Sequence, residues 1–314
     1  MARRLTAEAS GALRIEESVD SPAQASLRDR IAAYVALTKP RIIELLLVTT
    51  VPSMIVAAEG WPGLSLVLWT LLAGGLSAGG ANAINCYVDR DIDAVMTRTR
   101  KRPLPTHKIA PGRALVFGTV LGVVAFLLMW GTVNLPAAFL SLFALLFYVF
   151  VYTLGMKRST PQNIVIGGAA GAMPALVGWA AVTGTIELPA LALFGIIFYW
   201  TPPHFWALAM RYEKEYARAD VPMMPVVYGR KETVRHILLY SLMLFAMCLA
   251  FFSVAKMGII YLIAAVALNA MFVGWAVKLW RNTSTRTAWG LFRFSIYYLA
   301  LLFMAAAADV LIRA

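Results

Sequence analysis

An amide and two carboxylates recur at every fourth position near residue 90. Asn85, Asp89 and Asp93 have an i, i+4, i+8 spacing, which at about 100° per residue places them within an arc of roughly 80° on one helix face. Asp91 projects to nearly the opposite side. Amide and carboxylate oxygens are hard ligands for Mg²⁺, which in turn bridges to phosphate oxygens. The spacing therefore predicts a magnesium site near the end of a helix.

Positive charges follow this triad closely. The run consists of Arg98, Arg100, Lys101 and Arg102. Carboxylates that hold a metal, beside cations that hold phosphate oxygens, are what a diphosphate leaving group requires. The alternative is a solvated helix end whose charges pair with one another. Against it stands the cost of an aspartate at membrane depth, about 2.5–3.5 kcal/mol on insertion scales.

A second polar group follows two consecutive prolines, Pro202 and Pro203. Its members are His204, Arg211, Lys214, Glu215, Arg218 and Asp220. We expect the prolines to break or kink the helix, which is tolerated at membrane depth where protein or a wet cavity receives the freed backbone groups. If the helix continues past residue 209, positions 204, 211 and 215 share one face. The alternatives are an interfacial histidine and ordinary loop charges.

A third candidate is the basic pair Lys157 and Arg158. Two basic residues at the end of an apolar segment most simply mark its cytoplasmic end. A phosphate contact is the alternative interpretation of the pair.

The elements that must position these residues lie in a membrane. Apolar residues make up 61% of the 314-residue chain and charged residues only 14%, against about 25% charged in a soluble domain. This composition excludes disordered, collagen-like and disulfide-scaffold classes. Windows of about 20 residues give candidate spans at 41–58, 64–84, 114–131, 135–154, 164–182, 188–209, 237–254, 259–277 and 294–312. We predict an all-α polytopic membrane protein with nine transmembrane helices.

The distribution of charge predicts the topology. A net charge of +12 would suggest nucleic acid in a soluble protein. With the N-terminus in the cytoplasm, however, 26 of the 28 Lys and Arg residues lie on the cytoplasmic side, and only Lys256 and Arg313 do not. This is the positive-inside pattern, so we predict no nucleic-acid partner. The long, charged loops 85–113 and 210–236 then lie in the cytoplasm, where their length favours a functional role.

The chain divides into three parts. Residues 1–23 are polar and are predicted to be a disordered tail. Residues 24–39 carry apolar positions 27, 31, 34 and 35, which predict an amphipathic helix in the membrane interface. Residues 40–314 form one membrane domain.

Five stretches of the chain carry a resemblance to a known family. They are TKPRIIELLLVTT (38–50), ANAINCYVDRDIDAVMTRTRKRPLP (81–105), YTLGMKRSTPQNIVIGGAAGAMPALVGWAAVTG (152–184), TPPHFWALAM (201–210) and EYARADVPMMPVVYG (215–229). On these stretches the chain resembles the UbiA-type intramembrane prenyltransferases, whose N-x-x-x-D-x-x-x-D pattern corresponds to Asn85, Asp89 and Asp93. The resemblance implies a UbiA-type bundle of nine helices.

Within that superfamily the stretches are most similar to the branch that acts on heme. This implies transfer of a farnesyl group from farnesyl diphosphate to the 2-vinyl group of heme B, a substrate here, giving heme O. One or two Mg²⁺ ions held by Asn85, Asp89 and Asp93 as catalytic residues would neutralise the diphosphate. The implied diphosphate-binding residues are Arg98, Arg102, Lys157, Arg158, Arg211 and Lys214. His204 is the implied heme-binding or acceptor-binding residue.

The same resemblance implies a bacterial inner-membrane location with the active-site loops on the cytoplasmic side. Heme A synthase and terminal-oxidase assembly proteins are the implied partners, besides the two substrates and the lipid bilayer.

The chain departs from the superfamily at one place. Many relatives carry a second D-x-x-x-D motif after the sixth helix, where this chain has Glu215 and Asp220 without that spacing. These two are the second-motif candidates. Two alternatives to the heme enzyme are another prenyltransferase with an aromatic or tetrapyrrole acceptor, and a secondary transporter, because intramembrane carboxylates also mark ion pathways.

Overall fold

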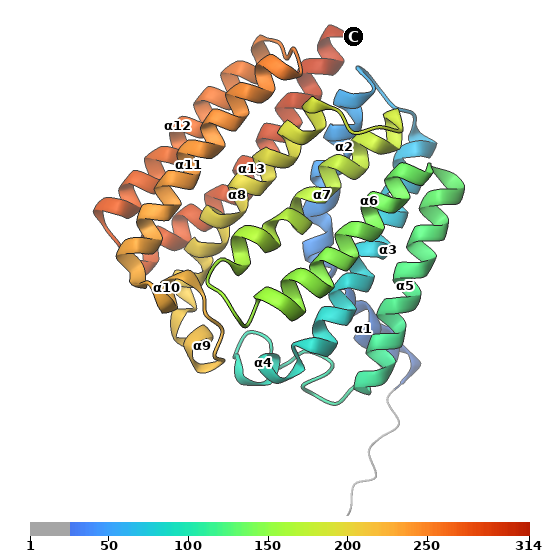
Figure 1. The fold of residues 1–314 in the computed structure, drawn as a ribbon, viewed down its shortest axis with the longest axis vertical. Coiled ribbons are helices and arrows are strands. Elements are labelled where there is room, and N and C mark those ends of the chain that lie inside the picture. The colour runs from blue at the N-terminus through green and yellow to red at the C-terminus, as the bar shows by residue number, and fades with distance from the viewer. Residues whose placement is uncertain (1–25) are drawn as a thin grey trace, which may run out of the picture.

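The described part of the chain is entirely helical (Figure 1). The computed structural model describes residues 26–314, with the backbone alone at 41–47, so the predicted tail 1–23 lies outside the described residues. The helices are α1 (Leu27–Thr38), α2 (Pro40–Ala57), α3 (Leu64–Val88), α4 (Arg90–Val95), α5 (Pro111–Thr132), α6 (Leu135–Leu146), the π-helix η1 (Phe147–Met156), α7 (Asn163–Thr183), α8 (Leu188–Arg211), α9 (Glu213–Arg218), α10 (Met224–Val227), α11 (Gly229–Val254), α12 (Ile259–Arg281) and α13 (Thr285–Arg313).

Within the residues that the structure describes, eight helical segments are long and apolar enough to cross a membrane. They are α3, α5, α6 continued by η1, α7, α8, α11, α12 and α13. The prediction of an all-α polytopic membrane protein is therefore confirmed. The 18-residue helix α2 corresponds to the first predicted span. Its crossing, the interfacial position of α1 and the orientation of the N-terminus stay predictions.

Close backbone contact holds α3 against α5. A Cβ atom on Gly80 would lie 2.7 Å from the carbonyl oxygen of Gly118, which is closer than real Cβ atoms come. Small residues are favoured at such contacts because they let two membrane helices approach. The contact lies little more than one turn before Asn85, so it fixes the position of the end of α3 that carries the first motif.

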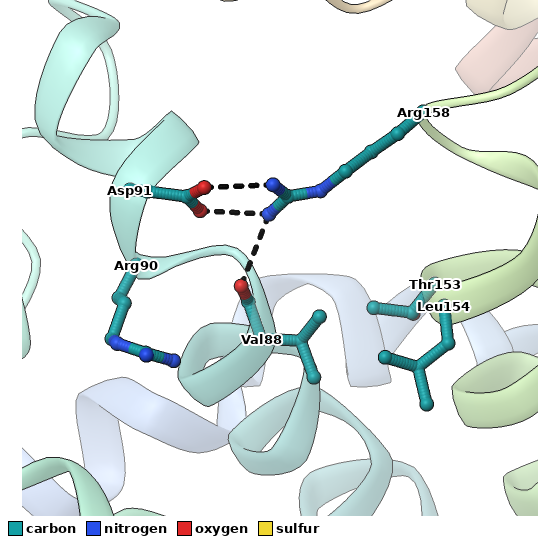
Figure 2. Close-up of a pocket in the computed structure, with 6 residues that line it drawn as sticks. All are labelled: Val88, Arg90, Asp91, Thr153, Leu154 and Arg158. Carbon is teal, nitrogen blue, oxygen red and sulfur yellow. Dashed lines mark hydrogen bonds and ion pairs between the residues drawn. The ribbon is translucent and has the colours of Figure 1, made fainter.

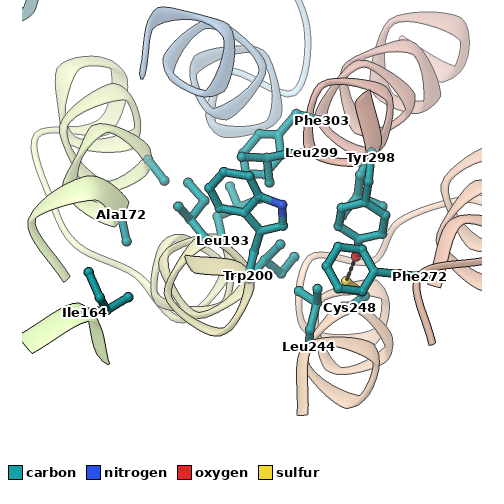
Figure 3. Packing of buried hydrophobic residues seen from close by; sticks show 14 of the residues in the cluster. Ile164, Ala172, Leu193, Trp200, Leu244, Cys248, Phe272, Tyr298, Leu299 and Phe303 are labelled. Atoms are coloured by element: carbon teal, nitrogen blue, oxygen red, sulfur yellow. Dashed lines mark hydrogen bonds between the residues drawn. The ribbon is translucent and has the colours of Figure 1, made fainter. Parts of the chain in front are cut away.

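The largest buried cluster joins α7 and α8 to α11 and α13. Figure 3 shows Trp200 of α8 packed among Leu193, Leu299 and Phe303, with Cys248 and Tyr298 nearby. The indole of Trp200 donates to the backbone oxygen of Ser295 on α13 at 2.9 Å, which pairs the one polar atom of this ring. The seam between α8 and α13 is thus fixed by packing and by a hydrogen bond.

The short helices α4, α9 and α10 lie at one end of the bundle, opposite the C-terminus (Figure 1). We call this the motif end. The two long charged loops of the sequence contain these helices, so the prediction that the loops share one side agrees with the observed arrangement.

The two prolines do not break α8, which continues through Pro202 and Pro203. The helix passes residue 209 as the shared face requires, but it ends at Arg211, before the third position of that face, Glu215. Tyr212 separates it from α9. The continuation of α6 as a π-helix was not predicted from the sequence. In this π-helix the hydroxyl of Thr153 donates to the carbonyl of Tyr148 at 2.8 Å. Such π segments often lie at functional sites.

Candidate active site

The first motif occupies the junction of α3 and α4. Asn85 lies in the last turn of α3, Asp89 between the two helices and Asp93 on α4. The amide of Asp89 donates to the carbonyl of Asn85 at 2.9 Å, and the amide of Asp93 donates to that of Asp89 at 2.8 Å. This i to i−4 register continues across the junction, so the three side chains stay together as the spacing predicts.

Burial separates these three side chains from Asp91. Asn85, Asp89 and Asp93 are 2%, 0% and 3% exposed, whereas the side chain of Asp91 is 61% exposed. Buried carboxylates are expensive unless they are paired with cations or metal ions. The structure therefore places the amide and both carboxylates of the predicted triad inside the bundle and Asp91 outside it.

Each member of the triad contacts a cation from a different segment. Lys39, between α1 and α2, donates to Oδ1 of Asn85 at 2.6 Å. Lys157, which follows η1, pairs with Oδ2 of Asp89. Arg102 donates to both oxygens of Asp93 at 2.8 and 2.7 Å. Three positive charges thus surround the site, which suits a polyanionic ligand.

The site shifts the pKa values of Lys39 and Arg102 in opposite directions. Burial lowers the pKa of Lys39 to about 8. Burial alone would also lower the pKa of Arg102, but the charge and hydrogen bonds of Asp93 raise it above its ordinary value. Sequence reasoning missed Lys39, because only the turn between α1 and α2, where Lys39 has a φ of 53°, brings it to a residue 46 positions away.

The triad can accept a divalent cation. Nδ2 of Asn85 donates to Oδ2 of Asp89 at 2.7 Å and to Thr153 at 3.2 Å. Oδ1 of Asp89 is buried and has no hydrogen-bond partner. This orphan oxygen, the amide oxygen of Asn85 and the carboxylate of Asp93 are hard donors of the kind that Mg²⁺ takes. Among the described residues there is no group of three or more His, Cys, Asp or Glu side chains that could hold a metal ion.

A pocket of about 360 Å³ lies beside the triad, between the α3–α4 junction and η1 (Figure 2). Its lining residues are Val88, Arg90, Asp91, Thr153, Leu154 and Arg158. Arg158 makes a two-pronged pair with Asp91 at 2.7 Å for both contacts. This hydrogen-bonded pair lowers the pKa of Asp91 to about 2 and raises the pKa of Arg158.

The other predicted diphosphate ligands lie at the motif end but do not contact the triad. The guanidinium of Arg98 lies 5.7 Å from the ring of Tyr212, and that of Arg211 lies 4.2 Å from the ring of Trp289. Lys214 is exposed on α9. The contacts of Arg98 and Arg211 with these rings are cation–π interactions. Of the six predicted ligands, the structure brings Arg102, Lys157 and Arg158 to the motif.

The two second-motif candidates have separate environments. Glu215 accepts hydrogen bonds from the backbone nitrogen and the hydroxyl of Thr97, at 3.1 and 2.5 Å. It therefore ties α9 to the loop that follows α4. Asp220 is exposed in a turn with a φ of 51°. Neither side chain contacts Asp89 or Asp93.

His204 lies deeper in the bundle than the motif-end charges. It is 7% exposed and lies seven residues before Arg211, about 10 Å along the helix. Its Nδ1 is 2.7 Å from the hydroxyl of Ser295, and its ring stacks on Trp200 with centroids 4.3 Å apart. Phe292 flanks the ring at 4.6 Å. The histidine is thus part of an aromatic wall between α8 and α13.

Comparison with known proteins identifies the family of this chain. The model of the UbiA prenyltransferase family matches residues 46–306. The protoheme IX farnesyltransferase of Parafrankia sp. (strain EAN1pec) is 52% identical over 291 residues, which cover 90% of this chain and 92% of that relative. Protoheme IX farnesyltransferase 1 of Saccharopolyspora erythraea is 54% identical over 285 residues, covering 90% and 91%.

A solved structure has the same fold. The UbiA homologue from Archaeoglobus fulgidus, solved with DMAPP and Mg²⁺, superposes with a TM-score of 0.63 at 16% identity, covering 87% of this chain and 99% of that one. Fold and site together define a multi-pass membrane protein with a charged polar site at one end of a helical bundle. The chain belongs to the UbiA prenyltransferase family.

Proposed function

We propose that this protein transfers a farnesyl group from farnesyl diphosphate to the 2-vinyl group of heme B, giving heme O. The observation that carries the proposal is the identity of about half of all aligned residues with curated protoheme IX farnesyltransferases over nearly the full length of both chains. The buried triad with its surrounding cations supports the same chemistry, because a prenyl diphosphate requires a site for its polyanionic head.

The cations of the site act on the leaving group. The allylic C–O bond of farnesyl diphosphate breaks, its electron pair remains on the departing diphosphate, and a delocalised allylic cation forms. Lys157, Arg102 and Arg158, which pair with the carboxylates of the triad, are proposed to bind the oxygens on which negative charge develops. We include Arg98, Arg211 and Lys214 as residues that guide the diphosphate at the motif end.

Asn85, Asp89 and Asp93 are proposed to hold Mg²⁺, with one or two ions bound. The metal supplies Lewis-acid neutralisation of the diphosphate. The Archaeoglobus fulgidus homologue of the same fold was solved with DMAPP and Mg²⁺, which supports metal-assisted prenyl chemistry on this fold. Lys39, Lys157 and Arg102 contact the three proposed ligands in this structure, so a bound metal ion would share these oxygens with the cations.

The acceptor reacts in the second half of the sequence. The terminal vinyl carbon forms a carbon–carbon bond with the allylic cation, the positive charge passes to the carbon next to the porphyrin, and water adds there with loss of a proton. The product carries a hydroxyethylfarnesyl substituent. Aromatic faces near the motif can stabilise the intermediate cations.

His204 is proposed to face the porphyrin and to bind its iron. Ser295 donates its hydroxyl hydrogen to the carbonyl of Phe292 at 2.6 Å, so its oxygen accepts from Nδ1–H of His204. This fixes the tautomer whose Nε2 carries the lone pair that an iron ligand needs. The acidic residues Glu215 and Asp220 are not required by this scheme.

The charge distribution supports a place in the bacterial inner membrane with the motif end in the cytoplasm. Extraction of heme from membranes of expressing cells, followed by chromatography, tests the proposed reaction. We expect heme O in cells with the wild-type chain and only heme B with Asp93→Asn. Accumulation of a prenylated phenol without heme O would instead identify a different acceptor.

A further inference from the structure

Arg158 is held in place by three hydrogen bonds that do not involve the triad. Its guanidinium pairs with both oxygens of Asp91 at 2.7 Å, and NH2 also donates to the carbonyl of Val88 at 3.1 Å (Figure 2). A guanidinium has five N–H groups, so two remain for another acceptor. The fork geometry of such a pair fixes the orientation of the arginine.

The same guanidinium lies next to the orphan oxygen of the site. NH2 of Arg158 is 3.9 Å from Oδ1 of Asp89, which is too long for a hydrogen bond. That oxygen is buried and has no hydrogen-bond partner. A guanidinium free to move would close this gap, because a buried carboxylate oxygen gains strongly from a charged donor. Something must therefore hold Arg158 back, and the Asp91 fork does so.

Stability alone does not explain the Asp91–Arg158 pair. The side chains of Asp91 and Arg158 are 61% and 40% exposed, and pairs of that exposure contribute little to folding. The carbonyl of Val88 and both oxygens of Asp91 nevertheless fix one orientation of Arg158 at the edge of the pocket. That orientation keeps the orphan oxygen of Asp89 available.

We propose that Asp91 is a positioning residue. It holds Arg158 away from Oδ1 of Asp89, so that this oxygen can bind Mg²⁺, and it directs the remaining N–H groups of Arg158 toward the diphosphate of the substrate. The second half rests on the proposed function, since it takes a prenyl diphosphate as the ligand. The first half rests on the part of the proposed function that assigns Mg²⁺ to the triad.

The test measures binding of Mg²⁺ alone to the purified full-length protein by calorimetry, with no heme or prenyl diphosphate present. In Asp91→Asn the released Arg158 pairs with Asp89, so we expect Mg²⁺ binding to weaken on the order of ten-fold, about 1.4 kcal/mol. The double variant Asp91→Asn/Arg158→Gln removes the competing cation. It should recover binding to within about two-fold of the Arg158→Gln variant, which a merely structural role of Asp91 would not produce.

Arg90→Gln is the matched control, because Arg90 lines the same pocket but donates to the carbonyl of Tyr87 at 2.8 Å. It should bind Mg²⁺ as wild type does. Wild-type affinity in Asp91→Asn, equally weak binding in the double variant, or no saturable Mg²⁺ binding by the wild-type protein would each overturn the proposal. Because heme takes no part, a wrong acceptor assignment leaves these results unchanged and is detected separately by heme chromatography.

Discussion

Buried carboxylates within an apolar bundle need positive charge near them, and Asp89 and Asp93 each have a cation in direct contact. The pairing neutralises these buried carboxylates, and under the proposed function a metal ion would compete with the resident cations for the same oxygens. Removing a buried charge that faces a diphosphate would then cost transition-state stabilisation directly. The proposed chemistry therefore depends on very few side chains.

Asp89→Asn should lower heme O formation at least about 100-fold, because the variant loses a charged metal ligand and the partner of Lys157. The measurement is product formation by the purified enzyme at saturating Mg²⁺. Asp220→Asn, which changes an exposed side chain, serves as the comparison and should retain most of the activity. An equal loss in both variants would contradict a single-motif site.

Lys39 provides a test by pH. Its pKa in the folded protein is about 8, below the ordinary 10.5. Between these values the unfolded chain binds more protons than the folded one, so the contribution of this group to stability rises with pH. The melting temperature of the wild type should therefore increase relative to that of Lys39→Met as the pH rises from 8 toward 10.5. A constant difference would show that Lys39 is not held in a desolvated site.

At the scale of elements, α9 and the loop after α4 are joined by Glu215. The contact links two loops whose helices lie far apart in the sequence. It holds the segment that carries Arg98 and Arg102 over the motif end, so it should influence substrate binding more than the chemical step.

Glu215→Ala should raise the KM for farnesyl diphosphate several-fold with a smaller change in kcat, because the loop after α4 loses its tie. Hydrogen exchange at the amide of Thr97 should accelerate at the same time. Glu213→Ala, on the same helix, breaks a pair with Arg230 and should leave Thr97 protected. Unchanged exchange at Thr97 in Glu215→Ala would show that the Glu215–Thr97 hydrogen bonds do not hold the loop after α4.

The sequence predicted the positions of the long helices better than the structure of the segments that join them. The four-residue spacing of Asn85, Asp89 and Asp93 correctly predicted that their side chains lie on the same side. The reason is that the i to i−4 hydrogen bonds continue from α3 into α4. The prolines of α8 did not break the helix, because a membrane helix can absorb freed backbone groups among its neighbours. Contacts such as Lys39 with Asn85 depend on how distant helices pack, and no local pattern encodes them.

At the scale of the whole molecule, charge asymmetry predicts which end faces the cytoplasm. Lys256 lies in the turn between α11 and α12, and the backbone oxygen of Lys256 accepts from Arg313 near the C-terminus, away from the motif end. The two exceptions to the positive-inside count therefore lie together. Both native cysteines are buried, so introduced cysteines can report the topology.

A cysteine at exposed Arg218 should react with a membrane-impermeant maleimide only after the cells are opened, because the motif end is predicted to face the cytoplasm. A cysteine at exposed Lys256 should react in intact spheroplasts. The reverse pattern would place the site on the wrong side for the proposed orientation.

Asn85, Asp89 and Asp93 are proposed to bind a divalent cation beside a prenyl diphosphate. Anomalous scattering from crystals grown with Mn²⁺, which suits the same oxygen ligands as Mg²⁺, and a non-hydrolysable farnesyl diphosphate analogue tests it most directly. We predict a metal peak within bonding distance of the carboxylates of Asp89 and Asp93, with Lys157 in contact with the diphosphate. A metal peak remote from both carboxylates would contradict it.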